Sequence, residues 1–196
     1  WIQTERERII NELEIKNRES ETLRKSLASI VTTFDLMEVV ERILDQMKFV
    51  IPYDTASVWR VDGEWQMPII SRDLPPEVLP HELKFQIDQD NSSRPIIQGE
   101  KPYILNNNVQ EELKDFKGPH SYINSWLAVP LKAKGKIIGL IALDGRSKGL
   151  FNEHHAELAV TFANQVAIAL ENASLFTELQ SELSLREDPI KELETK

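Results

Sequence analysis

The residues that could do chemistry in this chain are scattered along it. His154 and His155 are adjacent at the start of a predicted helix, so their side chains point in different directions and miss the four-residue spacing of a helical metal site. The carboxylates of Glu111, Glu112 and Glu182 have no histidine, serine or lysine at a spacing useful for proton transfer. The sequence therefore predicts neither a metal site nor a catalytic site.

Composition excludes several further classes of protein. The 196 residues include no cysteine, which removes thiol nucleophiles, cysteine zinc sites and cofactors attached through a thioether. A net charge of -9 argues against binding to nucleic acid or to an anionic membrane. The longest apolar run, residues 137–143, is far shorter than the ~18 residues of a membrane span. We expect a cytoplasmic location, and a start at Trp1 rather than Met is typical of a piece of a longer protein.

Residues 1–34 are predicted to form a signalling helix. Acids and bases are mixed without glycine or proline over residues 5–25, and from Ile9 onward a seam of mostly apolar residues recurs at alternating spacings of four and three, with polar interruptions at Lys16 and Ser20. This spacing predicts a parallel two-stranded coiled coil, and the alternative is a single helix that lies on its own domain. The predicted interface residues here are Leu23, Leu27, Ile30 and Phe34.

Residues 35–180 carry the pattern of one α+β domain. Asp35 and Glu38 have the spacing of a capping box, which predicts the start of a helix. Alternating and apolar runs then predict two β-hairpins, one over residues 55–70 and one over residues 125–144. The second hairpin is the more apolar, so we expect its strands at the centre of the sheet.

The segment between the two hairpins is predicted to be mostly loop. Residues 71–100 contain four prolines and a polar run, which is typical of a long loop that covers a site. A short strand over residues 101–105 and a short acidic helix over residues 109–116 are expected to follow.

A last helix of about 30 residues is predicted to begin after Asn152. Its small residues allow close approach of another helix, so we expect a homodimer through the N- and C-terminal helices. Residues 181–196 would continue as a helical linker to an output domain. The predicted interface residues of this helix are Val166, Ala169, Ala173 and Phe176.

Two strings of this chain resemble the GAF domain family. SWLAVPLKAKGKIIGLIALDG, followed by LFNEHHAELAVTFANQVAIALENASLFTEL, is similar to the C-terminal half of a GAF domain. FDLMEVVERILDQMKFVIPYDTASVWRVDGEW is similar to the first helix and first hairpin of the family. The resemblance implies a central antiparallel sheet of about six strands, with long N- and C-terminal helices on one face and ligand-pocket loops on the other.

The resemblance also implies a regulatory role. GAF domains are sensor modules of phosphodiesterases, phytochromes and histidine kinases, and ERERIINELEIKNRES is similar to signalling helices beside input domains of bacterial histidine kinases. We therefore expect a non-catalytic sensor domain from a two-component system, which binds an unknown small molecule and relays the signal through a helical dimer bundle. A ligand-free dimerisation spacer and a haem-binding sensor are the alternatives.

Known ligands of the family can be compared with this chain. Covalent bilin attachment and free methionine sulfoxide reductase activity are excluded because they need cysteine. The cyclic-nucleotide branch resembles N-K…F-x3-D-E, whereas His155-Ala156 stand here in place of Asp-Glu. A haem branch resembles HPPMRTFLGVP, and HSYINSWLAVP here matches its histidine at His120 but lacks two prolines and the methionine. We expect His120 to be an exposed structural residue rather than a haem ligand.

Trp59 is the first candidate for a ligand pocket. In YDTASVWRVD it matches a chromophore-facing Tyr of the similar phytochrome string YDRVMVYRFD, and alternation then places Ser57 on the pocket side and Val58 toward the helices. A ligand-free core would instead pack its aromatic rings together with no cavity. The ligand-binding residues predicted from strand alternation or loop position are Ser57, Trp59, Phe85, Arg94, Tyr103, Ser125 and Trp126.

Overall fold

The structure, a computed structural model, describes residues 36–79, 83–116 and 118–193. Residues Val39–Asn172 form one compact unit, and the described residues 36–38 and 173–193 belong to a second unit. No helix among the described residues is long and apolar enough to cross a membrane. The predicted coiled-coil residues Leu23, Leu27, Ile30 and Phe34 lie outside the described ranges.

A six-stranded antiparallel sheet forms the centre of the first unit, with the strand order β3-β2-β1-β6-β5-β4. Both predicted hairpins are confirmed, as β1–β2 and β5–β6, and they meet at the centre of the sheet because β1 pairs with β6. The strands are β1 (Thr55–Asp62), β2 (Trp65–Arg72), β3 (Phe85–Gln86), β4 (Ile104–Asn106), β5 (Ser125–Ala133) and β6 (Lys136–Gly145).

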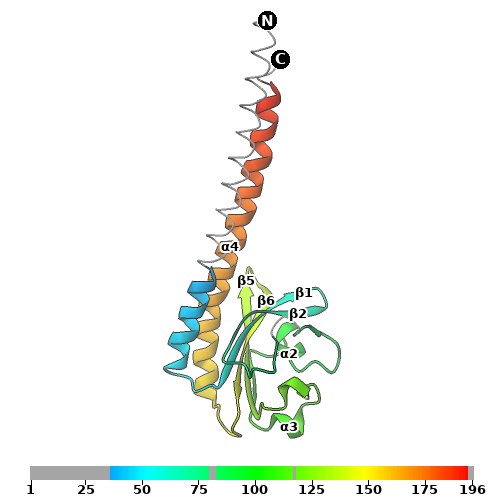
Figure 1. Cartoon of the computed structure of the whole chain (residues 1–196), viewed down its shortest axis with the longest axis vertical. Coiled ribbons are helices and arrows are strands. Elements are labelled where there is room, and N and C mark those ends of the chain that lie inside the picture. The colour runs from blue at the N-terminus through cyan, green and yellow to red at the C-terminus, as the bar shows by residue number, and fades with distance from the viewer. Residues whose placement is uncertain (1–35, 80–82, 117, 194–196) are drawn as a thin grey trace, which may run out of the picture. The chain divides into compact units, whose positions relative to one another are not determined.

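Helices cover both faces of this sheet (Figure 1). On one side lie a helix over residues 36–48 and the first part of α4 (Glu153–Leu193), which bury apolar residues such as Leu44, Met47 and Val166. On the other side lie the short helices α2 (Arg94–Ile97) and α3 (Val109–Glu112), together with the connecting loops. The predicted α+β architecture of the GAF type is therefore confirmed.

The connecting segments differ from the prediction in detail. The expected acidic helix over residues 109–116 ends at Glu112, because Leu113 adopts an extended backbone and Phe116 turns into the core. A 3-10 turn, η2 (Gly118–His120), follows it. α4 has 41 residues, because the expected helix of about 30 residues continues without a break into the segment predicted as a helical linker, as far as Leu193.

Two local contacts fix the start of α4 and the close pairing of β1 with β6. Asn152 caps α4 as predicted, since its Oδ1 accepts a hydrogen bond from the backbone N–H of His155 at 2.9 Å. Gly139 of β6 lets the neighbouring strand β1 approach closely, because a Cβ at this position would lie 2.0 Å from the carbonyl oxygen of Trp59. The close approach brings the cavity-facing residues of β1 and β6 together.

Candidate functional site

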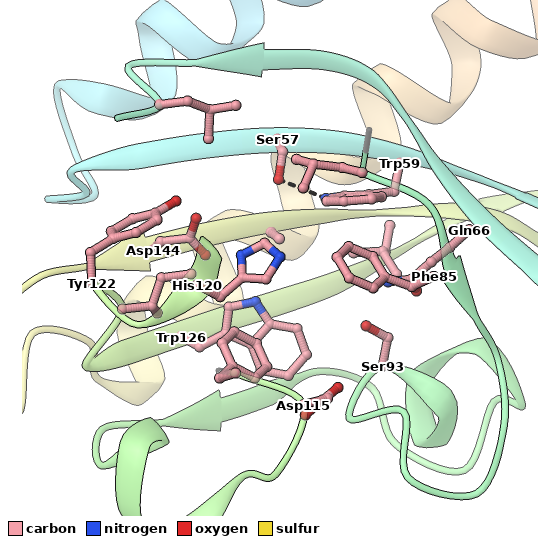
Figure 2. Close-up of a pocket in the computed structure, with 16 residues that line it drawn as sticks. Ser57, Trp59, Gln66, Phe85, Ser93, Asp115, His120, Tyr122, Trp126 and Asp144 are labelled. Atoms are coloured by element: carbon pink, nitrogen blue, oxygen red, sulfur yellow. Dashed lines mark hydrogen bonds between the residues drawn. The ribbon is translucent and has the colours of Figure 1, made fainter. Parts of the chain in front are cut away.

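A cavity of about 50 Å³ lies between the sheet and the loops on the face opposite α4 (Figure 2). It collects side chains from β1, β2, β3, β5, β6 and η2, so that all of the sheet except the edge strand β4 contributes. The lining residues are Ser57, Trp59, Gln66, Leu74, Leu83, Phe85, Ser93, Asp115, Phe116, His120, Tyr122, Ile123, Trp126, Leu140, Ala142 and Asp144.

A row of five rings forms much of the wall. The ring centroids of Trp59 and Phe85 are 5.5 Å apart, those of Phe85 and His120 are 5.2 Å apart, and those of His120 and Phe116 are 6.0 Å apart. Trp126 completes the row at 4.8 Å from Phe116. All four separations fall in the favourable range for aromatic pairs. Figure 2 shows the His120 ring near the middle of the cavity, among the other labelled side chains.

Strand alternation places Ser57 and Trp59 on this face, as predicted, while Val58 between them is fully buried and does not line the cavity. The indole Nε1 of Trp59 donates a hydrogen bond to Ser57 Oγ at 2.6 Å (Figure 2), which fixes the orientation of the indole. Because the hydroxyl of Ser57 is the acceptor in this bond, its own hydrogen is free to point at a ligand.

Two polar atoms of the cavity wall are buried without a hydrogen-bond partner among the described residues: Gln66 Oε1 and His120 Nε2. Leaving such an atom unpaired costs about 1–3 kcal/mol. Gln66 is 7% exposed, so solvent does not reach it freely. A bound molecule that pairs with either atom would recover part of this free energy.

Asp144 is the buried carboxyl of the site. The hydroxyl of Thr55 donates to its Oδ2 at 2.5 Å, and the hydroxyl of Tyr122 lies 3.3 Å from Thr55 Oγ1. Burial raises the pKa of Asp144 to about 7, although the hydrogen bonds from the two hydroxyls favour the charged form. The pKa of Tyr122 is raised as well, chiefly by burial. Asp144 therefore titrates near neutral pH and Tyr122 stays protonated.

His120 is not the exposed residue that the sequence predicted. Its ring packs between Phe85 and Phe116, and burial lowers the pKa of the imidazole even though the carboxylate of Asp115 acts in the opposite direction. The expectation failed because the turn that carries His120 folds back over the sheet. At neutral pH the ring is uncharged.

Four of the seven predicted ligand residues line the cavity: Ser57, Trp59, Phe85 and Trp126. The other three lie elsewhere. Arg94 borders an open polar groove beside α2 and β4, and the hydroxyl of Tyr103 donates a hydrogen bond to Glu153. The side chain of Ser125 is buried, and its Oγ donates to the carbonyl oxygen of Ser147 and accepts from the backbone N–H of Leu150.

The polar lining residues that the sequence did not predict are Gln66, Ser93, Asp115, Tyr122 and Asp144, and His120 was considered only as a haem ligand. The sequence does contain an indication of Asp144, because a carboxyl side chain directly follows the apolar run of β6, where a buried strand would ordinarily carry another apolar residue. Gln66 alternates with Trp65 and Met67 on β2, but nothing in that pattern marks it as buried.

The predicted interface residues of α4 differ in exposure. Val166 is fully buried within its own unit, Ala169 and Ala173 are half-buried, and Phe176 is 44% exposed. Other apolar residues of the helix are exposed too, namely Ile168, Leu175 and Leu179.

The cavity does not fit haem. About 50 Å³ is far too small for a macrocycle of four pyrrole rings, and aromatic neighbours pack against the ring of His120. Among the described residues, no group of three or more His, Asp or Glu side chains could hold a metal ion.

Comparison with known families and structures gives one consistent answer. A GAF domain family model matches residues 35–171, and a search of curated proteins finds no match. A GAF/HD domain protein from Geobacter sulfurreducens is 17% identical with a TM-score of 0.62, covering 73% of this chain and 96% of that one. The domain of a putative two-component sensor histidine kinase from Sinorhizobium meliloti 1021 is 18% identical with a TM-score of 0.54, covering 76% and 96%. The type II free methionine-R-sulfoxide reductase from Thermoplasma acidophilum is 13% identical with a TM-score of 0.59, covering 72% and 94%. At these identities the similar structures show the fold alone.

Proposed function

Because the chain belongs to the GAF domain family, whose members are regulatory sensor domains of signalling proteins that include histidine kinases, we propose that its cavity binds a small molecule. The observation that carries the proposal is the pair of buried, unpartnered atoms Gln66 Oε1 and His120 Nε2 in one cavity wall. A core built only for packing gains nothing from such atoms, whereas a binding site uses them to orient its ligand.

We propose that occupancy is relayed by a shift between two packings of the terminal helices. The cavity residues Ser57 and Trp59 alternate along β1 with Val58, which faces the helix side of the sheet. A ligand that moves β1 would therefore favour one packing of the helices, and only its difference in affinity for the two states can drive the change. On this proposal the domain belongs to a cytoplasmic histidine kinase or a related bacterial protein.

Ligand binding is tested with a library of nucleosides, amino acids and aromatic acids. Tryptophan fluorescence reports on Trp59 and Trp126 once the other two tryptophans of the chain, Trp1 and the more exposed Trp65, are replaced by Phe. A ligand at 100 times its dissociation constant should stabilise the fold by about 2.7 kcal/mol. Gln66→Leu should weaken binding about tenfold or more by removing the unpaired acceptor, while Gln98→Leu in the outer groove should not.

A ligand-free spacer is the second candidate, and the small volume of about 50 Å³ favours it. A spacer should gain stability when its unpaired acceptor is removed, so Gln66→Leu would then raise the melting temperature and no compound would shift it. A ligand whose affinity depends on Gln66 would contradict the spacer.

We propose a homodimer that uses an exposed apolar stripe of α4. Ile168, Leu175 and Leu179 are 59%, 43% and 55% exposed, and their spacings of seven and four residues put them on one face of the helix. Such a stripe is typical of a helix that packs against another helix. In this proposal Val166 serves the domain core and not the interface, because it is fully buried.

The dimer is tested by sedimentation at micromolar concentration. Replacing Leu175 and Leu179 by Lys would place like charges in the interface, and the double variant should shift toward monomer without unfolding the sheet. Ser174→Lys with Glu178→Lys is the matched control, since it adds lysines at the same spacing on a neighbouring face. A monomeric parent, or equal effects of the two pairs, would count against this interface.

A further inference from the structure

The imidazole of His120 occupies the central position in the row of rings. Two aromatic rings lie beyond it on each side, Trp59 and Phe85 on one and Phe116 and Trp126 on the other. It is the only one of the five that carries a buried ring nitrogen without a partner. The indole Nε1 of Trp59, by contrast, is hydrogen-bonded to Ser57 Oγ. The cavity thus holds a heteroaromatic ring that suits its walls but leaves one polar atom unsatisfied.

The backbone of His120 is held more firmly than its side chain. Its carbonyl oxygen accepts hydrogen bonds from Ile123 N at 3.1 Å and from Gln110 Nε2 at 3.2 Å. No described hydrogen bond holds its imidazole. A change of side-chain rotamer would therefore withdraw the ring while the turn stays in place.

Withdrawal of the ring would enlarge the cavity. With the ring in place the cavity measures about 50 Å³, which is enough for water. Sites for organic ligands measure about 300–1,000 Å³. We propose that the imidazole of His120 occupies the ring position of the ligand site, and that the ligand is a small, uncharged, planar heteroaromatic compound that displaces it. This inference rests on the proposed function of the cavity.

The polar lining narrows the class of ligand. None of the described residues that line the cavity is Lys or Arg, whereas Asp115 and Asp144 both contribute to it, so an anionic ligand would meet no cation. Gln66 Oε1 needs a donor, and the hydroxyl of Ser57 has a hydrogen to give. A ring with both an N–H group and an acceptor atom, as in an imidazole, a pyrimidine or a purine base, meets these requirements without a phosphate.

The test uses imidazole itself as the probe. His120→Ala should open the ring position, and calorimetry and thermal unfolding at pH 8.5, where the probe is uncharged, should show imidazole binding at least tenfold more tightly to the variant than to the unchanged protein. Tetrahydrofuran, a five-membered ring without a π system or N–H group, should bind more weakly. His155→Ala, which removes a histidine at the start of α4, is the matched control and should gain no imidazole binding.

His120→Leu is a second variant, which can be used if His120→Ala folds poorly. Leucine fills the ring position with an apolar side chain, so this variant should not bind imidazole. Its affinity for any ligand of the unchanged protein should be at least tenfold lower, because moving a leucine side chain from the cavity into water costs more free energy than moving an imidazole. Equal imidazole binding by His120→Ala and the unchanged protein would overturn the inference. So would a ligand of the unchanged protein that binds both His120 variants with unaltered affinity, although the sensor function would then stand. Imidazole binding by His120→Ala, with no library compound bound by the unchanged protein, would support the ring position and count against the sensor function.

Discussion

Replacing Asp144 by Asn should remove a large pH dependence from the stability of this domain. Asp144 is 5% exposed, and its carboxyl lies beside the hydroxyl of Thr55 with no cation among the residues that line the cavity. Burial raises its pKa from 3.8 to about 7. Between these two values the folded protein keeps a proton on Asp144 that the unfolded chain has released, so the free energy of unfolding falls as the pH rises.

The size of the effect follows from the shift. Each pKa unit corresponds to about 1.4 kcal/mol, so a shift of about three units corresponds to about 4 kcal/mol. This contribution is fully present below about pH 4 and is lost by about pH 7. Asparagine is uncharged at every pH, and its side-chain oxygen can still accept the hydrogen bond from Thr55. Asp144→Asn should therefore match the unchanged protein near pH 4 and exceed its stability by up to about 4 kcal/mol at pH 8.

Urea unfolding of both proteins from pH 4 to pH 8 measures this difference, and the contributions of all other groups cancel when the two curves are subtracted. Asp62→Asn is the control, because it removes a carboxylate whose side chain is 69% exposed. A difference that stays within about 0.5 kcal/mol across the range, or a variant that is less stable at pH 8, would refute the assignment of a buried, protonatable carboxyl.

Three further predictions concern other parts of the domain. Burial lowers the pKa of His120, so the contribution of this residue to stability is present above the ordinary pKa of 6.5 and is lost as the pH falls. His120→Leu should therefore lose less of its free energy of unfolding between pH 8 and pH 5 than the unchanged protein does, as measured by denaturant unfolding. Gly139→Ala should destabilise by about 1–3 kcal/mol because its Cβ meets the Trp59 carbonyl, and an unchanged free energy of unfolding would contradict the close-approach explanation. Asn152→Ala should lower the free energy of unfolding by about 1 kcal/mol through loss of the α4 cap, and an unchanged melting temperature would argue against it.

The local pattern of the sequence was enough for most of the fold. The Asp62-Gly63 turn lies between two runs of alternating residues, and the run from Ile137 is nearly all apolar, so both hairpins were predictable from periodicity. Strand alternation also placed Ser57 and Trp59 on one face of β1. These features depend on residues close together in the chain, which is why sequence alone determined them. The six-stranded sheet itself came from the resemblance to the GAF family.

Only the tertiary structure decided the chemistry of the site. Asp144 and Thr55 are 89 positions apart, and their hydrogen bond exists because β6 pairs with β1. His120 enters the row of rings because a turn between α3 and β5 folds over the sheet, and no periodicity encodes that path. Burial, unpaired atoms and raised or lowered pKa values all depend on which distant segments meet, so a sequence pattern can propose the strands but not the polarity of the cavity between them.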